Sequence, residues 1–250
     1  MISKKELSLA IIIFYILASF SLAQEEKVGA FKITSTSLDI LGDELATNFE
    51  KILDKSKKLT WQIYVPKSYD PSLPSGILLF QTYGERHREP RGWKSVMEEK
   101  NLIFVRIYTG GMLAYGKEML HGIMALPLLQ EKYKINTNRV YSIAYRSCNV
   151  VGGTAQFYPH IIKGSIYVNC IPFTWKKEEP EKIELMRKNR YVFIHGINSK
   201  AKAAAKQEEQ RYNESGILNT KFSVISRLRN NDNVGRRGLL EAISFLDNTE

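Results

Sequence analysis

Short apolar runs, nearly unbroken by polar residues, recur along most of this 250-residue chain. They are Ile77–Phe80, Leu102–Val105, Val140–Ala144, Ser165–Val168 and Tyr191–Ile194, with Phe222–Ile225 as a further candidate. Such runs are typical of parallel strands that are covered on both faces. Segments with helical spacing lie between them, at Trp93–Lys100, Lys117–Tyr133 with a break near Pro127, Val150–Tyr158, Lys200–Ser215 and Leu239–Asp247. The alternation predicts an α/β fold, a three-layer sandwich with a mostly parallel central sheet.

The stretch before these runs has a different pattern. Leu59–Val65 alternates in hydrophobicity and stops at Pro66, which predicts a half-buried antiparallel strand near the edge of the sheet. Gly42 and Asp43 form a typical helix start, with Asp43 as N-cap, and apolar residues then recur at helical spacing. We therefore expect one amphipathic helix that ends near Lys58, in an N-terminal extension of residues 24–58 that precedes a single domain of residues 59–250.

The first 23 residues have the pattern of a secretory signal peptide. Lys4 and Lys5 precede an apolar stretch, Leu7–Leu22, and Ser21 and Ala23 have the small-residue spacing of a cleavage site. The apolar stretch is short for a membrane span, which needs roughly 20 residues. We expect cleavage after Ala23, a secreted or periplasmic protein and no stable membrane anchor. An uncleaved signal anchor is the alternative.

The chain has a formal net charge of +10, which could direct it to an anionic partner. The basic residues are spread over many segments, however, and lack the interleaved aromatic residues of a base-stacking surface. We therefore expect no nucleic-acid binding and interpret the charge as a solvated basic surface. One alternative function follows from it, that of a structural or interaction protein whose basic exterior is the working surface.

The segment Arg139–Gly153 predicts a strand, a sharp turn and a helix. Its β-branched and aromatic run ends at Ala144, short polar residues follow, and small and apolar residues resume after Asn149. The apex of such a turn lies beside a helix N-terminus, which stabilises negative charge. Because sites in parallel sheets form at the carboxyl ends of the strands, this turn is the predicted functional site.

Several short motifs keep an order and spacing that resemble a known family. They are Tyr64–Asp70, Pro90–Lys94, Tyr133–Asn136, Arg139–Tyr141, Tyr158–His160 and Lys163–Tyr167, followed by weaker matches at Arg190–Ile194 and Ala242–Asp247. Together they resemble the secreted esterase and polyhydroxybutyrate-depolymerase-like branch of the α/β-hydrolases over most of the mature chain. The resemblance implies an α/β-hydrolase-like fold and, in active members, a Ser-Asp-His triad.

None of the three triad positions carries the expected residue. The elbow pattern Gly-x-Ser-x-Gly falls on Ala144–Cys148, which puts Arg146 in place of the serine. A guanidinium cannot attack a carbonyl because it stays protonated. The acid position falls on 196–199, where there is no carboxylate, and the histidine position falls on 230–233, where there is no histidine. These departures predict a pseudoenzyme that binds a ligand without turning it over.

The unknown small ligand of such a pseudoenzyme is expected at Arg146. A guanidinium beside a helix N-terminus favours an anion such as a carboxylate or a phosphate. Alternatively, Arg146 forms an ion pair with an acid of the pocket or turns to solvent. The neighbouring loops predict no second ligand group, since His87 lies among charged residues and Gly110-Gly111 matches no phosphate-binding fingerprint. We expect no cofactor and no metal, and the oligomeric state stays open.

The second hypothesis is an active esterase-type hydrolase with an atypical nucleophile. Ser147 and Cys148 follow the apex directly, and His195, just beyond a predicted strand, is the nearest candidate base. Residues past the apex point away from the oxyanion hole, however, which argues against this arrangement. Of the other histidines, His121 is expected to pack on its helix and His160 to lie in a surface turn.

Cys148 and Cys170 are the only two cysteines, and each follows the carboxyl end of a predicted strand. Consecutive strands in such folds are usually neighbours, so the two side chains are expected at one edge of the sheet. An exported protein matures in an oxidising compartment, which favours a disulfide between them. Two buried free thiols are the alternative.

Overall fold

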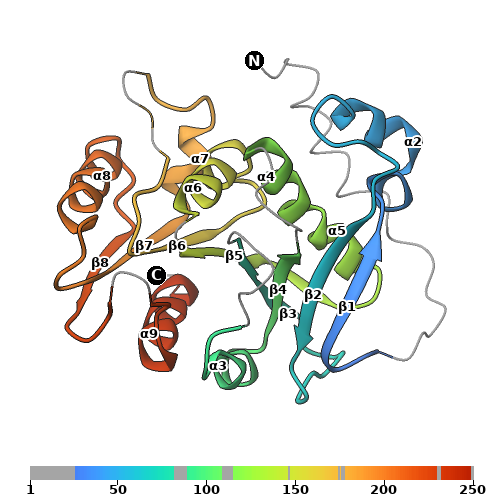
Figure 1. The fold of residues 1–250 in the computed structure, drawn as a ribbon, viewed down its shortest axis with the longest axis horizontal. Coiled ribbons are helices and arrows are strands. Elements are labelled where there is room, and N and C mark those ends of the chain that lie inside the picture. The colour runs from blue at the N-terminus through green and yellow to red at the C-terminus, as the bar shows by residue number, and fades with distance from the viewer. Residues whose placement is uncertain are drawn as a thin grey trace.

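Among the residues that the computed structural model describes, eight strands form one sheet in the order β1-β2-β4-β3-β5-β6-β7-β8 (Figure 1). The described residues are 26–81, 89–108, 115–145, 147–173, 175, 178–229 and 232–248. The strands are β1 Gly29–Ser35, β2 Leu59–Val65, β3 Ser75–Phe80, β4 Leu102–Tyr108, β5 Ile135–Tyr145, β6 Gly164–Val168, β7 Arg190–Gly196 and β8 Thr220–Ile225. β2 pairs antiparallel with β1 and with β4, and the other pairings of this sheet are parallel. The predicted mostly parallel sheet is confirmed.

Helices cover both faces of the sheet and complete three layers. They are α2 Ser37–Phe49, α3 Trp93–Lys100, α4 Tyr115–Ile123, α5 Ala125–Gln130, α6 Cys148–Phe157, α7 Ile183–Arg187, α8 Lys202–Glu214 and α9 Arg236–Asp247. α3 and α9 contact each other on one face, whereas α4 to α8 lie on the opposite face (Figure 1). The three-layer α/β sandwich that the sequence predicts is therefore confirmed.

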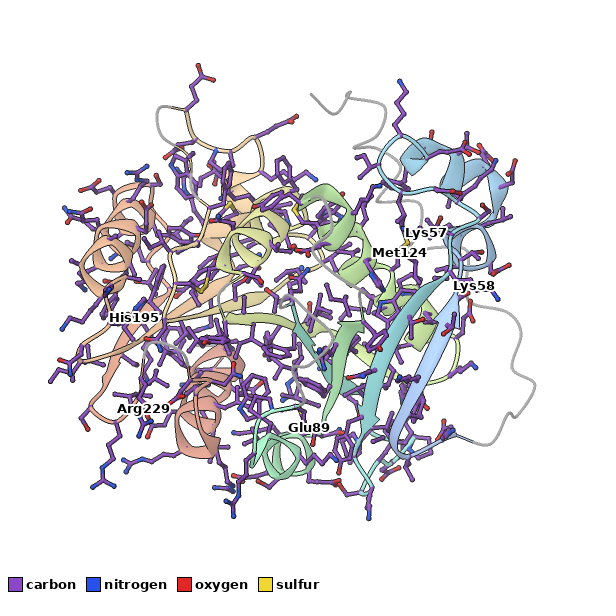
Figure 2. All side chains as sticks on the ribbon, viewed as in Figure 1. Lys57, Lys58, Glu89, Met124, His195 and Arg229 are labelled. Carbon is purple, nitrogen blue, oxygen red and sulfur yellow. A yellow bond between two sulfur atoms is a disulfide. The ribbon has the colours of Figure 1, made fainter. Side chains whose placement is uncertain are left out.

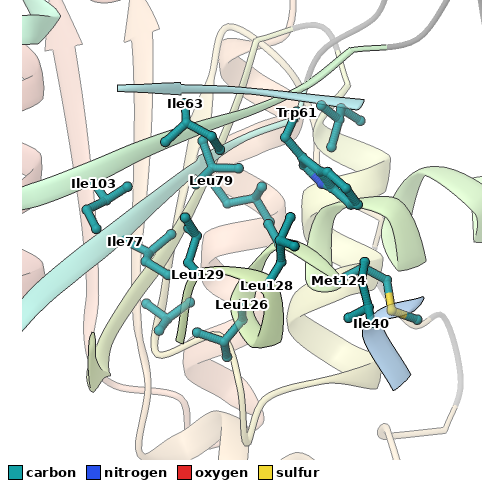
Figure 3. Packing of buried hydrophobic residues seen from close by; sticks show 14 of the residues in the cluster. Ile40, Trp61, Ile63, Ile77, Leu79, Ile103, Met124, Leu126, Leu128 and Leu129 are labelled. Carbon is teal, nitrogen blue, oxygen red and sulfur yellow. The ribbon is translucent and has the colours of Figure 1, made fainter. Parts of the chain in front are cut away.

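The apolar runs are buried because each strand sends alternate side chains to opposite layers. In β3, Ile77 and Leu79 pack in the cluster that includes α4 and α5, whereas Leu78 and Phe80 pack on the side of α3 and α9. Figure 3 shows the first cluster, in which Ile77 and Leu79 lie close to Leu129 of α5. Burying one such side chain contributes about 1.5–3 kcal/mol, so these alternating contacts hold the helices on both faces.

The N-terminal region differs most from the prediction. The sequence pattern does not predict β1, which pairs with β2 along its whole length and forms the outermost strand. The side chain of Thr36 caps α2, and Gly42, at φ 76°, interrupts this helix, so that regular helix resumes at Asp43. The expected end near Lys58 is wrong, because the helix stops at Phe49 and turns follow.

The other elements lie close to the predicted positions. β2 is antiparallel, as predicted, and is second from the edge because β1 lies outside it. The long helix expected over 117–133 is divided at Met124, and Pro127 lies in the first turn of α5, where proline is tolerated. α7 was not expected, because its 5 residues are too few for a periodic pattern. Within the described part of the chain, no helix has the length and apolar composition of a membrane span.

Glu98 of α3 holds the turn that follows β2. Its carboxylate accepts hydrogen bonds from Tyr64 Oη, the Lys67 N–H, the Ser68 N–H and Ser68 Oγ, at 2.5, 2.8, 3.2 and 2.6 Å. Burial disfavours the ionised carboxylate, but these hydrogen bonds outweigh it and lower the pKa of Glu98 from 4.5 to about 2. The interaction therefore depends on pH.

Replacing Glu98 with glutamine is expected to lower the free energy of unfolding at neutral pH by about 1–2 kcal/mol, allowing for solvent screening. Because the folded-state pKa is lowered, this contribution is complete above pH 4.5 and is lost as the pH falls towards 2. Denaturant unfolding of the wild type, Glu98→Gln and the exposed control Glu44→Gln, at neutral pH and near pH 2, measures it. A deficit in Glu98→Gln that is equally large at both pH values would contradict this account.

Candidate functional site

The predicted strand, turn and helix are present in the middle of the sheet. β5 ends at Tyr145 and α6 begins at Cys148, so a short turn joins the strand to the helix. Arg146, at the apex position, lies outside the described residues. Ser147 is the N-cap residue of α6. The N-terminus of this helix therefore lies at the carboxyl edge of the sheet, where the sequence places the site.

Ser147 has a buried hydroxyl without a partner among the described residues. The residue is 1% exposed, its Oγ accepts and donates no described hydrogen bond, and its side chain does not cap α6. A buried hydroxyl without a hydrogen bond lowers the stability of the fold, and such groups usually bond to a ligand, a water molecule or another protein group. Chemically, it can donate to or accept from a group bound at the N-terminus of α6.

A disulfide joins Cys148 and Cys170, as the sequence predicts. Their Cα atoms lie 5.8 Å apart, and β5 and β6 are hydrogen-bonded neighbours in which Tyr145 pairs with Val168. The bond connects the first residue of α6 to the segment that follows β6. While it is intact, Cys148 has no thiol with which to act as a nucleophile, and Ser147 is the candidate that remains.

Gln81, directly after β3, is a buried polar residue in a loop that the sequence predicts as polar and long enough to line a pocket, without singling out this side chain. Its side chain is fully buried, Nε2 lies 3.4 Å from Thr154 Oγ1 of α6, and Oε1 has no partner among the described residues. A Cβ on Gly122 would come within 2.6 Å of Gln81 Nε2, so glycine leaves room for this amide. The signal was a polar residue directly after an apolar run. The rest of this loop, including His87, lies outside the described residues.

The acid position of the resembled family is occupied by neutral groups. β7 ends at Gly196, and no carboxylate follows it within 196–199. Instead, the Gly196 N–H donates to Asn169 Oδ1 at 2.9 Å, and Asn169 Nδ2 donates to the Arg229 carbonyl at 2.8 Å. Asn169 follows β6 and has a left-handed φ of 52°, which asparagine tolerates better than most residues. Its amide thus connects the ends of β6 and β7 to the loop after β8.

The histidine position lies in that same loop after β8. Asn230 and Asn231 are outside the described residues, whereas the Asp232 N–H donates to the Arg229 carbonyl at 3.1 Å. Asn233 has a buried Oδ1 with no partner among the described residues. The described residues at this position are therefore an exposed carboxylate, Asp232, and an amide, Asn233, and an amide does not take up a proton in the working pH range.

His195, the candidate base, is a buried residue of β7 and does not contact Ser147. Figure 2 shows His195 in β7, next to the edge strand β8. Its Nδ1 lies 3.3 Å from Ser199 Oγ, its ring stacks on Phe222 with centroids 5.5 Å apart, and Nε2 has no described partner. β6 separates β7 from β5, so the two strands are about 10 Å apart. Burial, with a smaller contribution from Lys202, lowers the pKa of His195 to about 4. The imidazole is therefore neutral at neutral pH.

The other two described histidines, His121 and His160, pack against neighbouring parts of the fold. His121 packs on α4 as predicted, with Nε2 3.1 Å from the Thr60 carbonyl and its ring edge-on to Trp61. His160 follows α6, and burial together with Lys182 and Lys163 lowers its pKa to about 4. In the part of the chain that the structure describes, no group of three or more histidine, cysteine or acidic residues could hold a metal ion.

No family model matches this chain, and no curated protein matches it. Solved structures do match. A ferulic acid esterase is 12% identical with a TM-score of 0.58, and the alignment covers 88% of this chain and 98% of that one. The feruloyl esterase module from Clostridium thermocellum is 12% identical with a TM-score of 0.56, and 89% of each chain is covered. The chain has the α/β-hydrolase fold.

Larger proteins share this α/β-hydrolase fold as one part of their length. Porphyromonas gingivalis dipeptidyl peptidase 4 is 14% identical with a TM-score of 0.52; the match covers 77% of this chain but only 34% of that protein. The chain spans a similar share, 36%, of a dipeptidyl aminopeptidase from Bacteroides ovatus. At these identities the likeness concerns the fold alone, and the chemistry has to be argued from the residues.

In the α/β-hydrolase fold, the strand-to-helix turn carries the nucleophile, and the loop after the third strand contributes to the oxyanion hole. The structure places Ser147 at the N-cap of α6 and Gln81 against Thr154, further along the same helix. His195 does not contact Ser147. Ser147 Oγ and His195 Nε2 each lack a hydrogen-bond partner among the described residues. The site thus has hydrogen-bonding groups without a described nucleophile–base pair.

Proposed function

We propose that this protein is an exported α/β-hydrolase-fold protein that binds a small ligand at the turn between β5 and α6 without hydrolysing it. The observation that carries the proposal is the bridge made by Asn169, whose amide contacts Gly196 N at 2.9 Å and the Arg229 carbonyl at 2.8 Å. Neutral hydrogen bonds occupy the region in which an acid would orient a histidine. Without a base, a hydroxyl at the turn is not activated for attack.

Buried polar atoms without described partners support ligand binding at this edge of the sheet. They are Gln81 Oε1, Ser147 Oγ and Asn233 Oδ1, which follow β3, β5 and β8. Leaving such atoms unpaired costs about 1–3 kcal/mol each, so a polar ligand that satisfies them gains affinity. The N-terminus of α6 and the net charge of +10 favour a ligand with a negative group.

Export is the second element of the proposal. The pattern of the first 23 residues is that of a secretory signal peptide, and the Cys148–Cys170 disulfide suits an oxidising compartment. Intact-mass measurement of the exported protein tests it. A mature N-terminus at Gln24 is expected, whereas a membrane-bound product that retains Lys4 and Lys5 would contradict export in cleaved form.

The second candidate function is an esterase-type hydrolase that uses Ser147. The observation that favours it is the buried, unpartnered Oγ of Ser147 beside a helix N-terminus. The observation against it is the position of His195, which contacts Ser199 and lies on a strand that is not adjacent to β5. A general base must be within hydrogen-bond reach of the proton that it takes.

Hydrolysis of short-chain nitrophenyl esters separates the two candidates. We expect the wild type to be no faster than the uncatalysed reaction, and Ser147→Ala and the exposed control Ser226→Ala to behave in the same way. Native mass spectrometry of the purified wild type is expected to show a co-purified small ligand that Ser147→Ala binds less well. Turnover above background that Ser147→Ala abolishes and Ser226→Ala retains would establish the hydrolase instead.

A further inference from the structure

β1 is an edge strand of the sheet that the described residues form. Within the described residues it has one neighbour, β2 (Figure 1). The seven residues of β1 alternate between half-buried and exposed along the strand. The outer side of such a strand presents a row of backbone N–H and C=O groups that can pair with another extended chain. The side chains around β1 therefore determine which extended chain can pair with this strand.

A hollow of about 380 Å³ lies against one face of β1. Phe31 and Tyr133 give it an aromatic wall, and the exposed Lys27 and Lys132 lie at its rim. Two contacts fix this arrangement, since Tyr133 Oη donates to the Lys27 carbonyl at 2.7 Å and Lys27 Nζ lies 5.0 Å from the Phe31 ring centroid. The hollow can therefore take an apolar side chain and place positive charge beside it.

A second hollow, of about 270 Å³, lies along the same strand and includes residues of the opposite face. Its lining includes Lys32, Gln62 of β2, Phe104 of β4, and Glu89. Lys32 is exposed, and its Nζ lies 4.5 Å from the ring centroid of Tyr108. Because alternate side chains of a strand point to opposite faces, a chain paired with β1 would direct successive side chains towards the two hollows in turn.

We propose that the outer edge of β1 binds an extended, acidic peptide segment of a partner protein by strand addition. Backbone hydrogen bonds to β1 supply affinity, and the two hollows select alternate side chains. On the side of Phe31 and Tyr133 the segment carries apolar, β-branched residues, and on the side of Lys32 it carries carboxylates. The linings hold three lysines, Lys27, Lys32 and Lys132, against two glutamates, Glu26 and Glu89. Lys94 Nζ lies 3.0 Å from Glu89 and offsets its charge, so positive charge prevails along β1, within a chain of net charge +10.

The same charges argue against a second copy of this chain as the occupant. Antiparallel pairing of two β1 strands about their centre would put Lys32 of each copy opposite the other, and like charges directly opposite are destabilising. Two chains of net charge +10 also repel each other. Lysine on an edge strand discourages indiscriminate pairing, and here it leaves acidic segments as the favoured partners. The inference does not depend on the ligand proposed at the β5–α6 turn.

Fluorescence anisotropy of labelled peptides with the full chain tests the proposal. A peptide of alternating glutamate and valine is expected to bind, with affinity that falls as salt is added. Alternating lysine and valine is expected not to bind. The glutamate–valine peptide with alternate backbone nitrogens methylated keeps its charge but loses its N–H donors, so we expect it to bind at least about tenfold more weakly.

Charge-reversal variants locate the site. Lys32→Glu is expected to weaken binding about tenfold, because it replaces a cross-strand attraction by a repulsion. Lys132→Glu is expected to act in the same direction. Lys221→Glu, on the opposite edge strand β8, makes the same change in net charge and is expected to alter affinity less than about twofold. Thermal unfolding of each variant confirms that it is folded.

Three results would overturn the proposal. They are equal binding of the methylated and unmethylated peptides, an effect of Lys221→Glu as large as that of Lys32→Glu, and absence of binding to the folded wild type. The first two would indicate general attraction to a basic surface. The third would show that the edge of β1 does not accept an extended chain.

Discussion

Replacing Cys148 and Cys170 together with alanine is expected to lower the free energy of unfolding by about 3 kcal/mol. The disulfide closes a loop across a sequence separation of 22 residues, so its loss enlarges the ensemble of unfolded chains. Denaturant unfolding of the wild type and the double variant measures the difference. The effect is expected to be large for this chain, because 3 kcal/mol is a substantial part of the roughly 5–15 kcal/mol that stabilises a typical domain.

A reductant provides the control for this prediction. Reducing the folded wild type should lower its stability by a similar amount, whereas the double variant should not respond. Hydrogen exchange should also rise at the start of α6, because Cys148 is the first residue of that helix. Equal stability of the oxidised wild type and the double variant would contradict the account, as would two reactive thiols in the unfolded, unreduced wild type.

Replacing Gly196 with alanine is expected to destabilise the protein by about 3 kcal/mol. A Cβ at this position would overlap the backbone oxygen of Leu228, in the loop after β8, and a backbone atom cannot turn aside as a flexible side chain can. The loop would have to move, which would also strain the hydrogen bond from Asn169 to Arg229. Thermal and denaturant unfolding measure the loss of stability.

Gly235→Ala is the matched control, because nothing lies within 4 Å of the Cβ that it adds and its φ of −74° suits any residue. Because alanine is a poorer N-cap residue than glycine, Gly235→Ala is expected to lose about 0.5–1 kcal/mol, well below the loss in Gly196→Ala. Hydrogen exchange is expected to increase in residues 226–229 of Gly196→Ala and not in those of Gly235→Ala. Wild-type stability of Gly196→Ala would mean that the loop after β8 is not held against β7.

The parallel strands could be predicted from the sequence because both of their faces are buried. β3 has the uninterrupted run Ile77–Phe80, and each of these side chains is at most 2% exposed. β1 could not be predicted in the same way, since an edge strand with one neighbour needs neither an apolar run nor a fully buried face. The end of α2 was misplaced because Ile52 and Leu53 continue the helical spacing while packing in the core from turns.

The candidate site could be predicted as a place but not as a set of contacts. The strand–turn–helix pattern located Ser147, and the cysteine positions predicted the disulfide. Asn169 was missed because its role comes from a left-handed backbone and from contacts 27 and 60 residues away along the chain. His195 was predicted as a candidate base because it follows a strand, but the number of strands between it and Ser147 becomes known only from the sheet order.

The most direct test of the central claim, that the fold is kept without a working base for hydrolysis, is ester turnover by the variant Arg146→Ser. This change puts a serine at the sequence position that the elbow pattern gives to the nucleophile, one residue before the N-cap of α6. The account predicts no turnover above background, because the position after β7 has neutral groups in place of an acid, the position after β8 has no histidine, and His195 contacts Ser199. Ester hydrolysis by Arg146→Ser that is lost in Arg146→Ser/His195→Ala would contradict it and would identify His195 as a working base.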